Sequence, residues 1–80
     1  MKAEHNLKIL PQYFEAVLNR TKTFELRKDD RLIQVGDRLV LNEFNGDCLT
    51  GRTVTRTVTY CLRNCPKYGL RRGFVILGMS

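Results

Sequence analysis

Residues 52–62, Arg-Thr-Val-Thr-Arg-Thr-Val-Thr-Tyr-Cys-Leu, form a long run rich in β-branched residues. Threonine occupies every second position from 53 to 59, and a period of two is typical of a β-strand. The opposite side, which we expect to face the core, carries Val54, Val58, Tyr60 and Leu62. Arg56 falls on this same side, so either its guanidinium reaches solvent at the mouth of the core or a bulge turns it outward. The stretch predicts one long strand in a β-rich domain.

Shorter periodic segments flank this strand. The other predicted strands comprise residues 5–10, 21–28, 38–44 and 73–78. Asn45-Gly46-Asp47 is a strong signal for chain reversal. Pro11 begins a predicted helix that ends near Asn19, because apolar residues recur behind the proline at three- and four-residue spacing. The residues expected in the core are Phe14, Val17, Leu18, Phe24, Leu26, Leu39, Leu41, Val58 and Ile76.

Five strands and one helix within 80 residues predict a single domain, residues 1–80, of the α+β class. The edges of so small a sheet need protection. We therefore expect a five-stranded mixed β pseudo-barrel, plugged by the helix that follows its first strand. Such a barrel leaves a groove where a polar strand face meets the helix.

The chain is strongly basic, with 14 Lys and Arg against 8 Asp and Glu and a net charge of +6. This excess predicts either a polyanionic partner or simply a well-solvated surface. The cations expected to hold the phosphates of such a partner are Arg52, Arg56, Arg63, Lys67, Arg71 and Arg72. Tyr68 lies in a predicted loop beside Lys67, Arg71 and Arg72. We expect its ring to stack on a base.

Several classes of site and location are not expected. Cys48, Cys61 and Cys65 are odd in number and irregularly spaced, which indicates reduced thiols rather than a disulfide framework. They contain no CxxC pair, so we expect neither a zinc site completed by His5 nor any other metal or cofactor. The longest apolar run near the end, residues 74–77, is too short to span a membrane, and the first residues lack the apolar core of a signal peptide. A cytoplasmic protein is expected.

Residues 20–27, Arg-Thr-Lys-Thr-Phe-Glu-Leu-Arg, follow the predicted helix and resemble the Gly-x-Lys-x-x-Glu-x-Arg signature of the ASCH group in the PUA-like superfamily. Lys22, Glu25 and Arg27 match the signature. Further segments that resemble this group are His5-Asn-Leu-Lys-Ile9, Leu10-Pro-Gln-Tyr-Phe14, Val35-Gly-Asp37 and Gly73-Phe-Val-Ile-Leu-Gly78. The resemblance implies a PUA-like pseudo-barrel from a family of short, largely uncharacterised bacterial and phage domains, with an RNA-associated function in general terms.

One position departs from the signature. Arg20 stands where the signature has glycine, a residue that suits a left-handed helix end. We expect the preceding residue, Asn19, to take that role. The departure concerns the end of the helix more than the chemistry of the site.

The matching residues have a physical meaning as a ligand site. Strand parity places Glu25 and Arg27 on one face, about 7 Å apart along the chain, which is close enough for them to pair. A carboxylate and a guanidinium held in this way present an acceptor and donors to a nucleobase edge or a phosphate, and Lys22 adds a mobile cation. The alternative is an ordinary ion pair on a solvated sheet face.

The residues and the resemblance together predict a nucleic-acid-binding module that takes RNA or a nucleotide in the groove. The expected binding residues are Lys22, Glu25, Arg27, Arg52, Arg56, Lys67, Tyr68, Arg71 and Arg72. They make no prediction about oligomeric state.

Two other functions stay open. Some small ASCH proteins that resemble this chain hydrolyse the amide of acetylated cytidine, and in them a lysine activates a threonine three residues further on. Glu25 holds the place of that threonine, so a hydrolase would need Glu25 as general base and Lys22 as the stabiliser of an oxyanion. We expect no such hydrolysis. The third interpretation is a protein-partner-binding domain of a mobile element.

Overall fold

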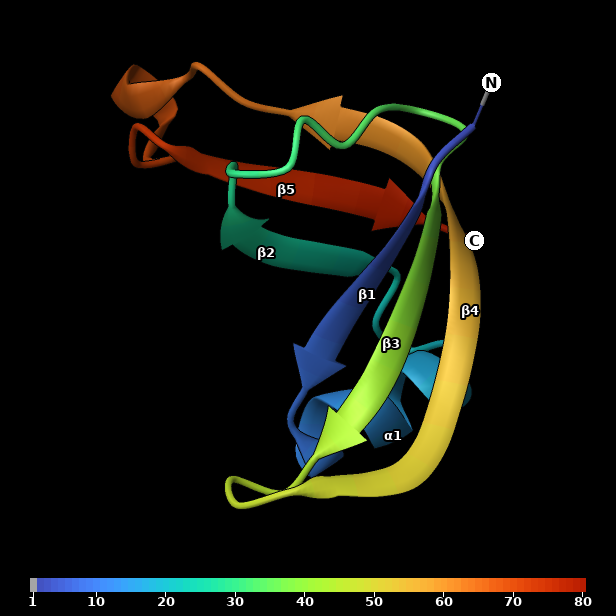
Figure 1. Ribbon diagram of the computed structural model, residues 1–80. Coiled ribbons are helices and arrows are strands. Elements are labelled where there is room, and N and C mark those ends of the chain that lie inside the picture. The colour runs from blue at the N-terminus through green and yellow to red at the C-terminus, as the bar shows by residue number, and fades with distance from the viewer. Residues whose placement is uncertain (1) are drawn as a thin grey trace.

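A computed structural model describes residues 2–80 and contains a sheet of five strands with one α-helix. The elements in chain order are β1 (Glu4–Ile9), α1 (Pro11–Leu18), β2 (Phe24–Lys28), β3 (Arg38–Phe44), β4 (Leu49–Leu62), the 3-10 helix η1 (Pro66–Tyr68) and β5 (Phe74–Met79) (Figure 1). The predicted α+β class and the order of the predicted elements are confirmed.

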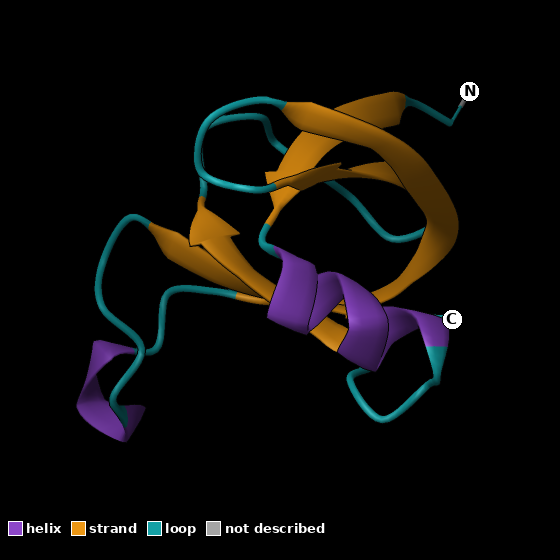
Figure 2. Ribbon diagram, turned by 90° about the horizontal axis from the view of Figure 1, so that it is seen from below, coloured by secondary structure: helices purple, strands orange, loops and turns teal. Residues whose placement is uncertain are grey.

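The sheet has the strand order β1-β3-β4-β5-β2. β1 pairs with β3 in parallel, and the other neighbours are antiparallel, so the sheet is mixed as expected. The long strand β4 pairs with β3 over its first part and with β5 over its last part. Figure 1 shows β4 bending sharply between these two parts, so that β1 and β3 run across the direction of β2 and β5. Seen from below, the strands curve around the interior and α1 lies across the near end (Figure 2).

A β-bulge between Val58 and Tyr60 marks the change in direction of β4. Val58 lies opposite Met79, yet Tyr60 lies opposite Gly78, so two residues of β4 advance against one residue of β5. A bulge of this kind reverses the alternation of faces beyond it. Val58 is buried, whereas Tyr60 is 64% exposed. The prediction that Tyr60 and Leu62 share the core face with Val58 is therefore wrong, and Cys61 packs against the core instead.

Arg56 stays on the inner face, at the rim of the core. Its Nη2 donates a hydrogen bond of 3.2 Å to the carbonyl oxygen of Val17, in the last turn of α1. A cation at the carbonyl end of a helix is favourably placed. Of the two predicted arrangements for Arg56, the structure has the one at the mouth of the core.

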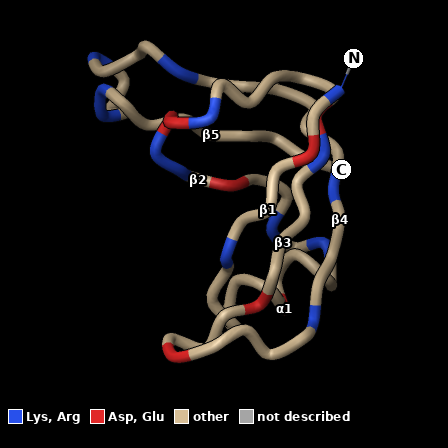
Figure 3. The backbone as a smooth tube through the Cα atoms, viewed as in Figure 1, with Lys and Arg blue, Asp and Glu red and all other residues tan. Residues whose placement is uncertain are grey.

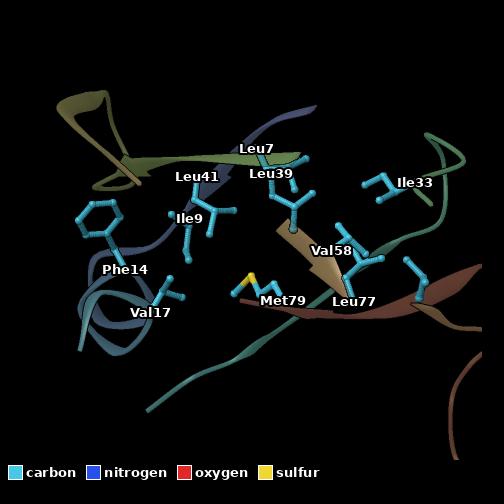
Figure 4. Packing of buried hydrophobic residues seen from close by; sticks show 11 residues of the cluster. Leu7, Ile9, Phe14, Val17, Ile33, Leu39, Leu41, Val58, Leu77 and Met79 are labelled. Atoms are coloured by element: carbon cyan, nitrogen blue, oxygen red, sulfur yellow. The ribbon is translucent and has the colours of Figure 1, made fainter. Parts of the chain in front are cut away.

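The core lies between the curved sheet and α1, and Figure 4 shows its side chains meeting from both. Its members are Leu7, Ile9, Phe14, Val17, Ile33, Leu39, Leu41, Val58, Val75, Leu77 and Met79. Phe14 and Val17 lie one turn apart and form the buried face of the helix. Leu18 is exposed at the end of the helix and Ile76 is only partly buried, so neither belongs to the core as predicted.

The largest correction concerns β2, whose predicted faces are reversed. Glu25 is 4% exposed, whereas Phe24 and Leu26 are 46% and 56% exposed. Glu25 lies directly opposite Leu77 of β5, a fully buried residue, and side chains opposite each other in a sheet share one face. The alternation divides the residues of β2 into the correct two faces. The expectation that the apolar face, with Phe24 and Leu26, meets the core is wrong.

The helix ends differently from the prediction as well. Asn19 has a φ of −86°, and Arg20 itself adopts the left-handed conformation with a φ of 66°. Asn19 contributes through its side chain, whose Oδ1 accepts hydrogen bonds from the backbone N–H and the hydroxyl of Thr21 at 3.0 and 2.7 Å. The left-handed position thus coincides with the glycine of the signature.

Candidate functional site

A groove of about 700 Å³ lies between β1 and β2, the two outer strands of the sheet. The curvature of the sheet brings these strands towards each other, with α1 and the segment after β2 completing the wall. Its lining residues are Leu7, Lys8, Ile9, Leu10, Tyr13, Lys22, Phe24, Glu25, Leu26, Arg27, Lys28, Asp30, Arg31, Ile33 and Phe74. The lining combines apolar side chains with five cations and two carboxylates. All three signature residues belong to it.

Lys22, Glu25 and Arg27 form one hydrogen-bonded cluster, which we call the signature cluster. The Nζ of Lys22 donates to Glu25 Oε1 at 2.7 Å, and the Nε of Arg27 donates to Glu25 Oε2 at 3.0 Å. The predicted pairing of Glu25 with Arg27 is therefore present. Because Glu25 is buried, the cluster is not an ion pair on a solvated sheet face. Two cations flank one carboxylate, which leaves the cluster with an excess of positive charge.

Arginine side chains bridge the gap between the outer strands. The Nη2 of Arg27 donates a hydrogen bond to the carbonyl oxygen of Lys8 on β1. The Nη1 of Arg31 donates to the carbonyl oxygen of Asn6 on the same strand at 2.9 Å. These carbonyls lie on the outer edge of β1, where a strand would otherwise pair. Arg31 was missed by the sequence interpretation, because its run Asp29-Asp30-Arg31 indicates only a turn.

Aromatic rings hold the position of Lys22. Its Nζ lies 5.4 Å from the ring centre of Tyr13 and 5.0 Å from that of Phe24, within the range of cation–π attraction. The same Nζ donates to the carbonyl oxygen of Phe24 at 2.8 Å. Phe24 was expected in the core, yet Phe24 and Tyr13 are both exposed and line the groove. Their spacing to Lys22 is visible only in the fold.

The predicted phosphate contacts on β4 lie apart from the groove lining. The guanidinium of Arg52 donates to both oxygens of Glu43 at 3.0 and 3.1 Å, pairs with Glu15, and lies 4.6 Å from the ring centre of Phe14. Bonding to Arg52 lowers the pKa of Glu43 below its ordinary value of 4.5. These contacts tie Arg52, like Arg56, to the packing of α1 on the sheet.

The remaining predicted residues lie on the loop between β4 and β5. Figure 3 shows Lys and Arg positions gathered along this loop and at the nearby end of β2. Arg63 donates to both carboxylate oxygens of Asp29 at 2.6 and 3.1 Å, and this bonding raises the pKa of Arg63. Tyr68 is 80% exposed, with the Nζ of Lys67 at 5.2 Å from its ring centre. Phe74, just after this loop, belongs to the groove lining. The guanidinium of Arg71 lies 5.9 Å from the centre of the Phe74 ring.

His5 has a clear structural role. Its Nε2 lies 2.9 Å from Asp37 Oδ2, and the backbone N–H groups of Ala3 and Gln34 also donate to Asp37, at 3.2 and 3.0 Å. The bond to His5, followed by the bond from Gln34, lowers the pKa of Asp37 from 3.8 to about 2. Asp37 thereby connects the start of β1 to the turn before β3.

Residues 2–80 contain no cluster of three or more His, Cys, Asp or Glu side chains arranged to hold a metal ion. Within the same range, no helix has the length and apolar character to cross a membrane.

Comparison with known proteins places the chain among uncharacterised domains. Residues 4–79 match the family described as "Domain of unknown function (DUF3850)". A protein of Escherichia phage P2, described as "Uncharacterized 12.9 kDa protein in GpA 3'region", is 40% identical over 55 residues. This alignment covers 69% of the chain and 50% of the phage protein, so the chain spans about half the length of the curated relative it matches. The expectation of an uncharacterised family with phage members is confirmed.

Proposed function

We propose that this chain, which belongs to the DUF3850 family, is a nucleic-acid-binding module that holds RNA or a nucleotide in the groove between β1 and β2. The observation that carries the proposal is the signature cluster, a buried carboxylate between two cations on the wall of an open groove. Buried charges are unfavourable for stability unless they are well paired, and an apolar residue could fill the same space. A role in recognising a polar ligand explains why β2 places this cluster inside.

The donors left over in the cluster suit a nucleotide. The guanidinium of Arg27 uses Nε and one Nη2 hydrogen in the contacts described above, so its Nη1 remains available to a phosphate or a base carbonyl. Glu25 can accept further hydrogen bonds from the amino or imino edge of a base. Tyr13 and Phe24 add ring faces beside Lys22, and aromatic faces stack on bases in many single-strand binders.

The geometry also supports the finer assignment to the ASCH group of the PUA-like superfamily. The sheet curls until arginines from β2 and the following turn reach the free edge of β1, which is the closure expected of a pseudo-barrel. The residue that replaces the signature glycine, Arg20, takes the left-handed conformation that glycine favours. The cluster residues occupy one groove, as a ligand signature requires.

A titration of a fluorescein-labelled, single-stranded RNA 12-mer tests the proposal by fluorescence anisotropy at two salt concentrations. We expect an affinity that falls steeply with salt, because phosphate contacts release counterions. Arg27→Ala should weaken binding at least about five-fold, the loss of roughly one good contact. The matched control is Arg38→Ala, which removes the same charge from an exposed arginine outside the groove lining.

Variants of the loop separate the two kinds of contact. Arg71→Ala and Arg72→Ala should weaken binding to all sequences alike, whereas Arg27→Ala should change which base is preferred. A thermal melt of each variant checks that the fold survives. Equal effects of Arg27→Ala and Arg38→Ala, or tight binding that ignores salt, would contradict the proposal and favour a protein partner or a neutral ligand.

A further inference from the structure

The outward face of β5, of β2 and of β4 beyond its bulge is largely apolar although it lies on the side away from the core. Val58, Leu77 and Met79 point into the core, as Figure 4 shows, and the positions that alternate with them on β5 and β2 point outward. The large outward residues are Phe24, Leu26, Tyr60, Leu62, Phe74 and Ile76. Phe24, Leu26, Tyr60 and Leu62 are exposed. This is an unusual concentration of apolar surface for so basic a chain.

The strand register arranges two of these rings around a glycine. Phe24 of β2 lies opposite Gly78 of β5, and Gly78 lies opposite Tyr60 of β4. We call this set the aromatic row. Its two ring-bearing positions are two strand spacings apart, about 9.6 Å. Gly78 contributes no side chain between them, but Thr59 Oγ1 and Tyr60 Cβ lie 3.1 and 3.5 Å from the position that a Cβ at Gly78 would take. A planar ring would therefore stack above these atoms, between the side chains of Phe24 and Tyr60, at about 3.5 Å from each ring.

Cations lie beside this face at Phe24 and at Phe74. The Nζ of Lys22 lies 5.0 Å from the ring centre of Phe24, and the guanidinium of Arg71 lies 5.9 Å from that of Phe74. Lys28 lies opposite Phe74 and is exposed. The outward positions of β2 and β5, and those of β4 beyond the bulge, carry no Asp or Glu, so the described part of this face is apolar and positive. Planar rings joined by negative charges fit this surface better than an apolar protein surface does.

We propose that the aromatic row stacks a base of a single-stranded nucleic acid between Phe24 and Tyr60. This inference rests on the proposed function, because Lys22 contacts both Glu25 in the groove and the ring of Phe24. A strand bound in the groove can therefore continue around the edge strand β2, with a phosphate at Lys22 and the next base on the outer face. β2 would then read the ligand on both sides.

The test compares a labelled single-stranded RNA 12-mer with a 12-mer of the same backbone that lacks its central bases. The intact chain should bind the complete strand more tightly. Tyr60→Leu should weaken binding of the complete strand about 5- to 100-fold and leave binding of the base-free strand nearly unchanged. Phe24→Leu, which also removes a ring from the groove lining, should weaken binding of the complete strand at least as much. Tyr60→Phe keeps the ring and should stay within about two-fold of the intact chain. Leu49→Ala, which shortens an exposed apolar residue outside this face, is the control.

The two proposals fail in different ways. Loss of binding in Arg27→Ala with no effect of Tyr60→Leu would overturn the aromatic row and keep the groove. Equal affinity of the intact chain for both strands would overturn the row as well. No binding of either strand would overturn both proposals. Concentration-dependent self-association that Tyr60→Leu abolishes would assign the face to a second copy of the chain instead. Thermal melts establish that each variant is folded. If Tyr60→Leu unfolds, Phe24→Leu and the conservative variant Tyr60→Phe still test the aromatic row.

Discussion

Replacing Arg20 by glycine should stabilise the protein. Arg20 has a φ of 66°, and a left-handed conformation costs a residue with a side chain about 1–2 kcal/mol. The side chain is exposed, and the backbone N–H keeps its 3.1 Å bond to the carbonyl oxygen of Val17 in the variant. Glycine makes the unfolded chain more flexible, which removes about 0.4–1 kcal/mol of the gain. The free energy of unfolding should therefore rise by about 0.5–1 kcal/mol, and Tm by about 2–8 °C for a domain of this size.

Asn19→Gly is the matched control for this change. The φ of Asn19 is −86°, so glycine relieves no strain there. The variant also loses the Asn19 side chain that accepts two hydrogen bonds from Thr21. We expect the free energy of unfolding to fall by about 1–2 kcal/mol. Urea titrations followed by circular dichroism measure both variants. If Arg20→Gly destabilises the protein as much as Asn19→Gly does, the assignment of a strained helix end at Arg20 is wrong.

Two further predictions concern acid stability and catalysis. Because the pKa of Asp37 falls from 3.8 in the unfolded chain to about 2 in the fold, its contribution to stability is complete above about pH 4 and disappears as the pH falls towards 2. Asp37→Asn should therefore be less stable than the unmodified chain at pH 6, with the difference narrowing between pH 4 and pH 2; a constant difference across urea titrations in that range would contradict this. The purified protein should not hydrolyse acetylated cytidine, since both oxygens of Glu25 already accept hydrogen bonds from cations and the carboxylate is poorly placed as a general base. Chromatography of the nucleoside measures this turnover. Turnover by the unmodified protein that is lost in Lys22→Ala would reverse that conclusion.

The sequence predicts the elements of this fold well because each has a strong local signal. Pro11 begins the helix, and the strand over residues 38–44 has the predicted bounds. The faces of the strands are harder to predict, since alternation divides a strand into two sides without saying which side meets the core. On β2, the carboxylate of Glu25 is the inward group, and its burial depends on Lys22 and Arg27 lying within hydrogen-bond reach. That arrangement exists only after folding.

The bulge in β4 is a second feature that local pattern hides. The alternation from Thr53 to Thr59 continues smoothly in the sequence, yet the extra residue between Val58 and Tyr60 turns the rest of the strand over. The positions beyond it give no signal of their own, because Tyr60 and Leu62 are as apolar as core residues. The best available signal for the site is the signature itself, with two cations and one carboxylate on residues 22–27 that can pair inside the sheet.

The reversed faces of β2 connect the two proposed surfaces. A strand built only for stability would place Phe24 and Leu26 in the core and Glu25 in water, because burying apolar side chains is favourable and burying a carboxylate is not. β2 does the opposite while lying at the edge of the sheet, where both of its faces and its outer side are near solvent. This arrangement exposes rings on one face and orders charges on the other, with Lys22 contacting both. A ligand with flat apolar rings and negative charges would make use of both faces at once, which is why we propose a nucleic acid for this strand rather than an apolar partner or a simple anion.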